Sequence, residues 1–365
     1  SQSSHSSRDF KYGDIDNDSK RELVTVGTSK FNGFIYFHIG IWKFINGQFI
    51  LTFQTNFTKS TTDITISKMN VALGDVDADG IVEVIVASYS HAEFASLRIY
   101  SWNGTALMLE HEENRPTAPT SLYWGDKLEI ADVDDDGVVE IIQSGLYGTT
   151  GWWCYLTIWR WDGNTLYQEY NDHSWQHFAH DIAICDVDKD NETEIIYVYE
   201  YEDPAVREAV RIYCWNNVTM SLEQTIVLPN SWSGNAGMYD VKCADIDEDN
   251  QIEIVICGQV SDPSPPEDFL QILTWNGSVA VFELQNISSS PNPSIYRNIN
   301  LVDIDADNHL EIIICGNFND SGNNKGIIRI LNWTGTVLYE EDLFTIFIEN
   351  TSQIDILYSV DMDYD

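Results

Sequence analysis

The sequence predicts an all-β protein built from repeated four-stranded antiparallel blades, a β-propeller with six complete blades and the first strand of a seventh. Three observations lead to this fold class. An acidic nine-residue loop recurs along the chain, the first aspartates of successive copies lie 54 to 61 residues apart, and apolar runs rich in β-formers flank each copy. No helical periodicity competes with these strands. A four-stranded repeat of this size is typical of a propeller blade.

The acidic loop is seen in full at Asp75-Val-Asp-Ala-Asp-Gly-Ile-Val-Glu83, with carboxylates at positions 1, 3, 5 and 9 and glycine at position 6. In a tightly wound backbone, alternating carboxylates converge on one point, and a carbonyl at position 7 adds another oxygen. This oxygen-rich set suits Ca²⁺ better than Mg²⁺, which keeps its waters and requires octahedral geometry. Gly80 permits the positive φ of a sharp turn. The repetition indicates a scaffold, not catalytic carboxylates.

The six complete loops supply the predicted calcium ligands, four in each: Asp14, Asp16, Asp18 and Glu22; Asp75, Asp77, Asp79 and Glu83; Asp132, Asp134, Asp136 and Glu140; Asp186, Asp188, Asp190 and Glu194; Asp245, Asp247, Asp249 and Glu253; Asp303, Asp305, Asp307 and Glu311. Position 6 is Gly or Asn in five loops and Ser19 in the first, which makes the first loop the exception. A seventh copy begins at Asp361 and is cut off by the end of the chain. The alternative is a set of solvated acidic turns that bind nothing.

The four strands of a unit follow in order. A short apolar strand enters the loop, and a near-continuous apolar strand leaves it, as expected of a strand buried on both faces. The third strand ends in an aromatic residue and a turn, as in 97–104, where Asn103-Gly104 favours a type I′ hairpin. The fourth strand is polar, as an outer strand should be. Blades are predicted to start near residues 10, 70, 127, 181, 240 and 298, with a partial blade at 354–365, so that a polar leader 1–9 precedes one domain 10–365.

These residues carry a family resemblance. The signature apolar-Gly-Asp-Val-Asp-x-Asp-Gly-x-x-Glu, followed by an apolar run, resembles the FG-GAP (VCBS-type) repeat of the integrin α-subunit propeller and its secreted relatives. The resemblance covers residues 10–365. It implies a propeller of seven blades with calcium between the first and second strands of a blade. It also implies a role in adhesion, in lectin-like binding or in a polysaccharide-degrading enzyme.

The composition narrows the possible partners. The chain has 19 basic and 58 acidic residues and a formal charge of −39, so a nucleic-acid phosphate backbone would be repelled. Of the 58 acidic residues, 27 lie in the complete and truncated loops. No apolar run has the length of a membrane span, and Ser1–Ser7 lacks the apolar core of a signal peptide, which suggests a processed chain or a fragment.

Six cysteines would allow disulfides in an exported protein. In the repeat register, however, Cys185, Cys257 and Cys315 take positions that hold small residues in other blades. We therefore expect mostly free thiols that pack as small apolar side chains. Ten Asn-x-Ser/Thr sequons indicate a glycoprotein, although asparagine also has a conformational reason to stand in these turns.

The twelve tryptophans fall into two groups. Seven recur at the blade period and are predicted to pack. The other five depart from the repeat and are predicted to bind the ligand on the connection-loop face opposite the calcium loops: Trp124, Trp152, Trp153, Trp175 and Trp232. The alternative is that they plug the connections or the central channel. His173, His177 and His180 share one connection, and their spacing alone does not establish a metal site.

We therefore expect an extracellular or cell-surface module that binds Ca²⁺ and a protein or carbohydrate ligand, as part of a longer polypeptide. The rival interpretation is the propeller domain of a polysaccharide lyase or hydrolase. A third is a structural repeat whose loops carry no ligand. No catalytic residue is predicted, because no Ser-His-Asp, Cys-His or paired-carboxylate arrangement stands out from the repeat.

Overall fold

The computed structural model of the chain describes residues 4–31, 34–59, 67–90, 94–116, 122–148, 153–172, 177–203, 206–227, 236–260, 267–288, 294–320 and 323–347. All of the regular elements in these ranges are β-strands. The described residues contain no helix long and apolar enough to cross a membrane. The chain divides into two compact units, Ser1–Ala179 and His180–Asp365, which are described separately. The predicted partial blade 354–365 lies outside the described ranges.

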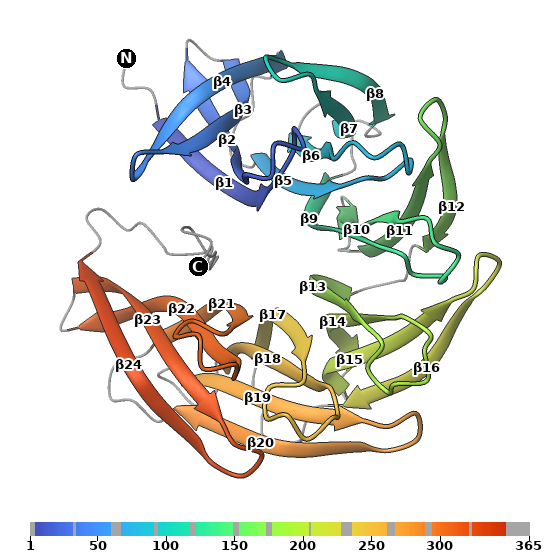
Figure 1. The fold of residues 1–365 in the computed structure, drawn as a ribbon. Helices are drawn as coiled ribbons and strands as arrows, with labels where there is room; N and C mark the ends of the chain where they lie inside the picture. The colour runs from blue at the N-terminus through green and yellow to red at the C-terminus, as the bar shows by residue number, and fades with distance from the viewer. Residues whose placement is uncertain are drawn as a thin grey trace. The chain divides into compact units, whose positions relative to one another are not determined.

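Unit 1 contains three four-stranded sheets, and each is one blade (Figure 1). The strands are β1 (Ser4–Gly13), β2 (Glu22–Phe31), β3 (Phe34–Ile45), β4 (Gln48–Lys59), β5 (Ser67–Gly74), β6 (Glu83–Ser90), β7 (Phe94–Trp102), β8 (Leu107–Pro116), β9 (Leu122–Ala131), β10 (Glu140–Gly148), β11 (Trp153–Trp161) and β12 (Leu166–Asp172).

Unit 2 contains the next three blades. The strands are β13 (His177–Cys185), β14 (Glu194–Asp203), β15 (Val206–Trp215), β16 (Met220–Val227), β17 (Ala236–Ala244), β18 (Glu253–Val260), β19 (Glu267–Trp275), β20 (Ala280–Ser288), β21 (Ser294–Val302), β22 (Glu311–Asp320), β23 (Asn323–Trp333) and β24 (Leu338–Phe347).

Within every blade the strands pair in chain order, and every described pairing is antiparallel. The fold class is therefore confirmed as all-β, with six four-stranded propeller blades. First strands begin three to six residues before the predicted blade starts, and β1 already includes part of the expected polar leader.

Blades pack on one another through the second strands, which are buried on both faces as the sequence predicts. In β6, Val84 and Val86 join the apolar cluster shared with the first blade, whereas Ile85 and Ala87 join the cluster shared with the third. Repeated aromatic residues close these clusters: Trp102, Trp161, Trp275 and Trp333 are each at most 6% exposed. The prediction that the repeated tryptophans pack is confirmed for these four and for Trp159 and Trp215, whereas Trp42 is half-buried.

Buried aspartates join the first strands of neighbouring blades, a feature that the sequence analysis missed. Asp240 on β17 is fully buried, and its Oδ1 accepts a hydrogen bond from the Val241 backbone N at 3.0 Å. Its Oδ2 accepts from the backbone N of Ile299 on β21, in the next blade, at 2.8 Å. Lys242 Nζ lies 2.8 Å from Asp240 Oδ1. One carboxylate thus joins two blades and neutralises a lysine.

The same bond recurs elsewhere. Asp181 on β13 accepts from Val241 N at 3.1 Å, and Asp9 on β1 accepts from the backbone N of Val71 on β5 at 2.9 Å. Each of these aspartates stands five residues before the first aspartate of its acidic loop. The acidic loop and the bond between blades therefore belong to one repeating unit.

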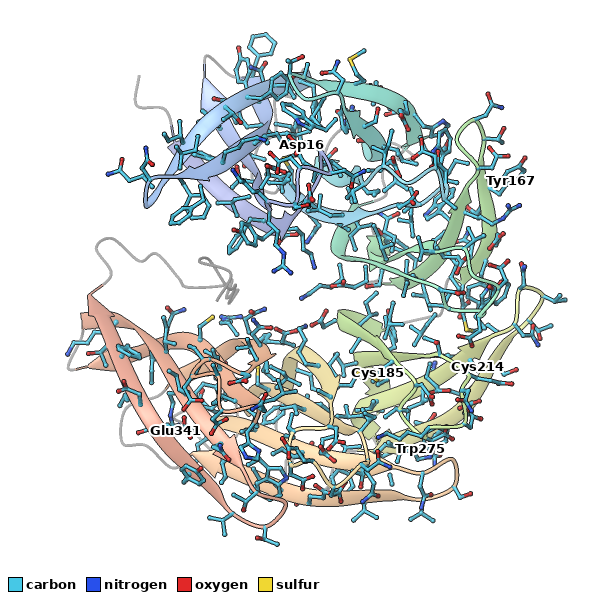
Figure 2. The ribbon with its side chains drawn as sticks, viewed as in Figure 1. Asp16, Tyr167, Cys185, Cys214, Trp275 and Glu341 are labelled. Carbon is cyan, nitrogen blue, oxygen red and sulfur yellow. A yellow bond between two sulfur atoms is a disulfide. The ribbon has the colours of Figure 1, made fainter. Side chains whose placement is uncertain are left out.

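The expectation about cysteines is wrong for one pair. Cys185, at the end of β13, forms a disulfide with Cys243 on β17, while Cys214, Cys257 and Cys315 are buried thiols outside any disulfide (Figure 2). Cys185 directly precedes its acidic loop, whereas Cys243 stands one residue further from its own. The repeat register did not align the two, and only the packing of neighbouring first strands brings their Cα atoms to 6.6 Å.

Candidate metal centres

Each acidic loop joins the first and second strands of its blade, and Asp16 in the β1–β2 loop marks one of them (Figure 2). In each loop the aspartate at position 1 stabilises the turn by accepting hydrogen bonds from backbone amides. In the second loop, Asp75 Oδ1 accepts from Asp79 N at 3.0 Å, and Asp75 Oδ2 accepts from Gly80 N at 2.9 Å. Asp77 Oδ1 also accepts from Asp79 N, at 3.2 Å. The carboxylates are thus oriented by the loop that they stabilise.

Two residues of every loop have a left-handed backbone. Position 6 was predicted to have positive φ, and all six loops confirm it, including Ser19 at φ 66°. Position 4 was not foreseen: it also has positive φ, at Asn17, Ala78, Asp135, Lys189, Glu248 and Ala306. For a residue such as Ala78 (φ 59°) this conformation costs roughly 1–2 kcal/mol. The repeated cost indicates that the loop shape is maintained for a purpose.

The glutamate at position 9 is the first residue of the second strand and is at most 1% exposed in all six blades. Its Oε2 accepts from the backbone N of position 2, for example from Val133 to Glu140 at 3.0 Å. Among the residues that the structure describes, Oε1 of Glu22, Glu140, Glu253 and Glu311 is buried without a hydrogen bond, and Oε1 of Glu22 forms an ion pair with Lys43 instead. Burial raises the pKa of Glu140 to about 8. A buried carboxylate oxygen without a partner is costly, and a cation would compensate for it.

The arrangement fits calcium. In the fourth loop, Asp186, Asp188, Asp190 and Glu194 each offer an oxygen, and these four atoms lie within 4.8 Å of one another. The second loop brings together Asp75, Asp77 and Glu83 in the same way. Calcium takes six to eight oxygen ligands at about 2.3–2.6 Å, many of them carboxylates. Bound there, it would supply the positive charge that the clustered carboxylates lack.

The hairpin of the following blade covers three of these loops. Turn glycines lie against the position-3 aspartate of the preceding blade: Gly163 on Asp77, Gly277 on Asp188 and Gly335 on Asp247. A Cβ on Gly277 would come within 2.5 Å of Asp188 Oδ2, so a larger residue there would push the loop aspartate aside. The turn after the third strand was predicted as a hairpin at Asn103-Gly104, and the contact of the later turn glycines with a loop aspartate follows from blade packing.

A second acidic position, missed by the sequence analysis, adjoins the loops. The third and fourth strands of each blade share a β-bulge, in which one residue of the fourth strand has no partner on the third. The bulged residues are Thr52, Glu110, Glu169, Glu223, Glu283 and Glu341, so five of the six are glutamate. Glu110 is close enough to raise the pKa of Glu83, after burial and Asp77. The available signal was a glutamate 27 to 30 residues after the loop glutamate of each of the last five complete blades.

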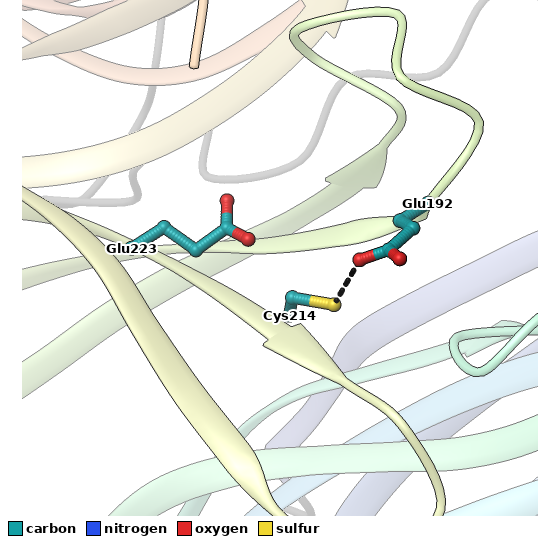
Figure 3. Close-up of side chains that lie close together, drawn as sticks. All are labelled: Glu192, Cys214 and Glu223. Atoms are coloured by element: carbon teal, nitrogen blue, oxygen red, sulfur yellow. Dashed lines mark hydrogen bonds between the residues drawn. The ribbon is translucent and has the colours of Figure 1, made fainter. Parts of the chain in front are cut away.

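One residue of the third strand also lies beside the loop. It is the second third-strand residue after the point where the bulge shifts the pairing register. It is Cys214 in the fourth blade, where its Sγ donates to Glu192 Oε2 at 3.2 Å and lies near the bulged Glu223 (Figure 3). In the fifth blade, Thr274 Oγ1 donates to the bulged Glu283 at 3.2 Å. Burial, and then Glu192, raises the pKa of the Cys214 thiol to about 12. A protonated thiol of this kind is a hydrogen-bond donor to the acidic group.

The first blade differs because this position is Lys43. Its Nζ donates to Asp16 at 2.7 Å and to Asp18 at 3.3 Å, and it forms an ion pair with Glu22 Oε1 at 3.2 Å. Partial burial lowers the pKa of the ammonium, but the bonds to Asp16 and Glu22 outweigh it and raise the pKa above its ordinary value. The first loop thus has a cation from the protein itself.

The predicted ligand-binding tryptophans are only partly within the described chain. Trp152, Trp175 and Trp232 lie outside it, as does His173. Trp124 lies within β9 and Trp153 begins β11, so these two belong to strands, not to connections. They pair with Leu146 and Tyr147 at the end of β10 that is remote from the acidic loop. His177 and His180 lie on β13.

Comparison with known proteins supports the fold only. No protein-family model matches the chain, and no curated protein matches it in sequence. A structure from Bacteroides uniformis named as a 6-phosphogluconolactonase is 12% identical, with a TM-score of 0.53 over 92% of this chain and 96% of that one. Its counterpart from Bacteroides fragilis is 10% identical, with a TM-score of 0.50 over 92% and 94%.

A rhamnogalacturonan lyase from Bacillus licheniformis is 14% identical and covers 92% of this chain and 73% of its own, but its TM-score of 0.43 is too low to support an argument. Identities of 10–14% do not transfer an activity. The chain shares a fold with the two Bacteroides structures, and its six blades are those of a β-propeller.

Proposed function

We propose that this protein is a calcium-binding β-propeller that acts outside the cell as a binding module for a carbohydrate or protein ligand. The observation that carries the calcium part is the buried Oε1 of the loop glutamate, which faces clustered aspartates and has no hydrogen-bond partner in Glu140, Glu253 and Glu311. Calcium is the common cation whose oxygen preference and flexible coordination match this set.

Two observations support an extracellular location. Short loops of this kind, with one carboxylate from each of four residues, resemble extracellular modules with a Kd of roughly 10⁻⁴ to 10⁻³ M, and such sites would be empty in a cytosol. The Cys185–Cys243 disulfide adds independent support, since disulfides persist in oxidising compartments. Calorimetry tests the affinity argument, which a Kd below about 1 µM would contradict.

Calcium binding is tested by titrating chelator-treated protein and following heat and melting temperature. We expect binding in the 10⁻⁴ M range and a higher melting temperature with calcium than with magnesium. Asp134→Ala should remove one bound ion and leave the others. If excess chelator and added calcium both leave the melting curve unchanged, the loops are held by hydrogen bonds alone and the calcium proposal is wrong.

The ligand surface is proposed at the end of the blades remote from the acidic loops. In the third blade, β10 begins at Glu140 in the loop and reaches Tyr147, the pairing partner of Trp153, seven residues later. At about 3.3 Å per residue the two ends are ~23 Å apart. Tryptophan offers a large, rigid contact area for sugars and proteins. A ligand there would not compete with calcium.

A glycan array in calcium identifies the ligand class, with Trp152→Ala/Trp153→Ala/Trp175→Ala as the test variant and Trp275→Phe as the matched control. The triple variant should melt like the parent and lose binding, because the three test positions depart from the blade repeat. The control should keep binding and lower the melting temperature, because Trp275 packs in the core. Undiminished binding by the triple variant would disprove this surface. Release of shortened polysaccharide products would favour the rival role in a polysaccharide-degrading enzyme.

A further inference from the structure

Lys43 contacts the first acidic loop at the atoms that a cation would use. Its Nζ lies 2.7 Å from Asp16 Oδ2, 3.3 Å from Asp18 Oδ2 and 3.2 Å from Glu22 Oε1. These three residues are positions 3, 5 and 9 of the loop. Glu22 is only 1% exposed, so its charge is shielded from water and needs a partner within the protein. The ammonium supplies that partner.

A divalent ion and this ammonium cannot occupy the first loop together. Calcium bound to three carboxylates lies about 2.3–2.6 Å from their oxygens. Nζ already lies 2.7–3.3 Å from Asp16 Oδ2, Asp18 Oδ2 and Glu22 Oε1, so calcium on these oxygens would compete with the ammonium for the same three atoms. Calcium would have to expel the lysine, which is itself only 27% exposed, and leave its charge beside a dication.

The other blades use different residues at the two positions beside the loop. Where the first blade has Lys43 on the third strand and Thr52 at the bulge, the second blade has Ser101 and Glu110. The remaining blades pair Arg160 with Glu169, Cys214 with Glu223, Thr274 with Glu283 and Asn332 with Glu341. Arg160, the one other cation, binds the bulged Glu169 at 2.7 Å. Lysine therefore appears in the one blade that lacks the bulged carboxylate.

The backbone does not explain the difference. Ser19 was the reason to expect an exceptional first loop, yet its φ of 66° matches the 69–72° of the asparagines at position 6 in the last three loops. In the first loop, as in the others, the first aspartate accepts from backbone amides: Asp18 N and Ser19 N donate to Asp14 at 3.1 and 2.8 Å. The first loop thus has the shape of the others and differs in its charge.

We infer that Lys43 is a built-in cation that replaces calcium in the first loop, so that five of the six complete loops take calcium and the first is independent of it. This rests on the proposed calcium function of the other loops. The first blade would then remain ordered when calcium is withdrawn, while the loops of the later blades lose their cation.

Native mass spectrometry of the chelated and calcium-loaded protein counts the ions in each variant. At a calcium concentration well above the proposed Kd, the parent should gain five ions in the complete loops. Lys43→Ser/Thr52→Glu, which installs the pair found in the second blade, should gain one more. The reverse exchange, Ser101→Lys/Glu110→Thr, should lose one. Lys20→Ser is the matched control, because it removes an exposed lysine of the same loop and should leave the count unchanged.

The outcomes separate the two proposals. A parent that binds no calcium disproves the proposed function and this inference with it. A parent that loads all six complete loops, or a Lys43→Ser/Thr52→Glu variant with the same count as the parent, overturns the role of Lys43 while calcium binding stands. If that variant does not fold, the reverse exchange decides: an unchanged count there also overturns the inference.

Discussion

Replacement of Asp240 by alanine should destabilise the second unit more than any exposed aspartate can. Asp240 Oδ2 is the acceptor for the buried backbone N of Ile299, at 2.8 Å, and an unsatisfied buried donor costs roughly 1–3 kcal/mol. Val241 N keeps an acceptor, since Asp181 Oδ2 lies 3.1 Å away. Lys242 loses its nearest carboxylate, at 2.8 Å, but retains Asp181 at 3.5 Å.

Taken together, these losses predict a fall of about 3 kcal/mol in the free energy of unfolding, within the range for removing one member of a buried charged pair. Asp240→Asn should cost less, about 1–2 kcal/mol, because its oxygen can still accept from Ile299. The assay is urea-induced unfolding of calcium-saturated protein, followed by tryptophan fluorescence.

Asp342→Ala is the matched control for Asp240→Ala. Asp342 Oδ1 also accepts from the next backbone N, that of Leu343, at 2.7 Å, but Asp342 is exposed on β24. Its replacement should change stability by no more than ~0.5 kcal/mol. If Asp240→Ala and Asp342→Ala unfold at the same urea concentration, the carboxylate between blades does not stabilise the fold and this reasoning is refuted.

Three further predictions concern the loops and the disulfide. In chelator, melting temperature should fall from pH 5 to pH 8. The buried Glu140 has a folded-state pKa of about 8 against an ordinary 4.5, so within this range the folded chain holds a proton that the unfolded chain has released, and that stabilisation is lost as the pH rises towards 8. Saturating calcium should abolish the fall, and a flat profile in chelator would contradict the prediction. Gly277→Ala should lower melting temperature and calcium affinity more than Gly104→Ala. Both glycines have positive φ, but of the two only Gly277 lies against a loop aspartate. Equal melting temperatures and equal calorimetric affinities for the two variants would exclude that contact. Cys185→Ser should lower the free energy of unfolding in denaturant by up to about 4 kcal/mol, because the disulfide closes a loop with a sequence separation of 58 residues in the unfolded chain. An unchanged unfolding midpoint would show that the bond is not formed in solution.

Features encoded within one repeat could be predicted from the sequence. The loop Asp75–Glu83 specifies its own turn through spacing and glycine, and the apolar run after it specifies a strand buried on both faces. The turn at Asn103-Gly104 likewise marks a hairpin from neighbouring residues, but the predicted type I′ geometry is wrong there: only Gly104 has positive φ, and residues 103–106 join the two strands through a hydrogen bond from Asn103 N to Ala106 O. Such signals are local, because the atoms that interact lie within a few positions of one another.

What only the tertiary structure decided are the contacts between strands and between blades. The bulged Glu110 and the cation Lys43 reach their loops because the third and fourth strands fold back beside the first two, at distances in sequence that vary from blade to blade. Cys185 meets Cys243, and Asp240 meets Ile299, because neighbouring first strands pack side by side. A repeat pattern aligns equivalent residues in different blades, whereas these contacts join residues that are not equivalent. Spacing along the chain therefore predicts where an acidic loop stands, and packing decides which side chains lie beside its carboxylates.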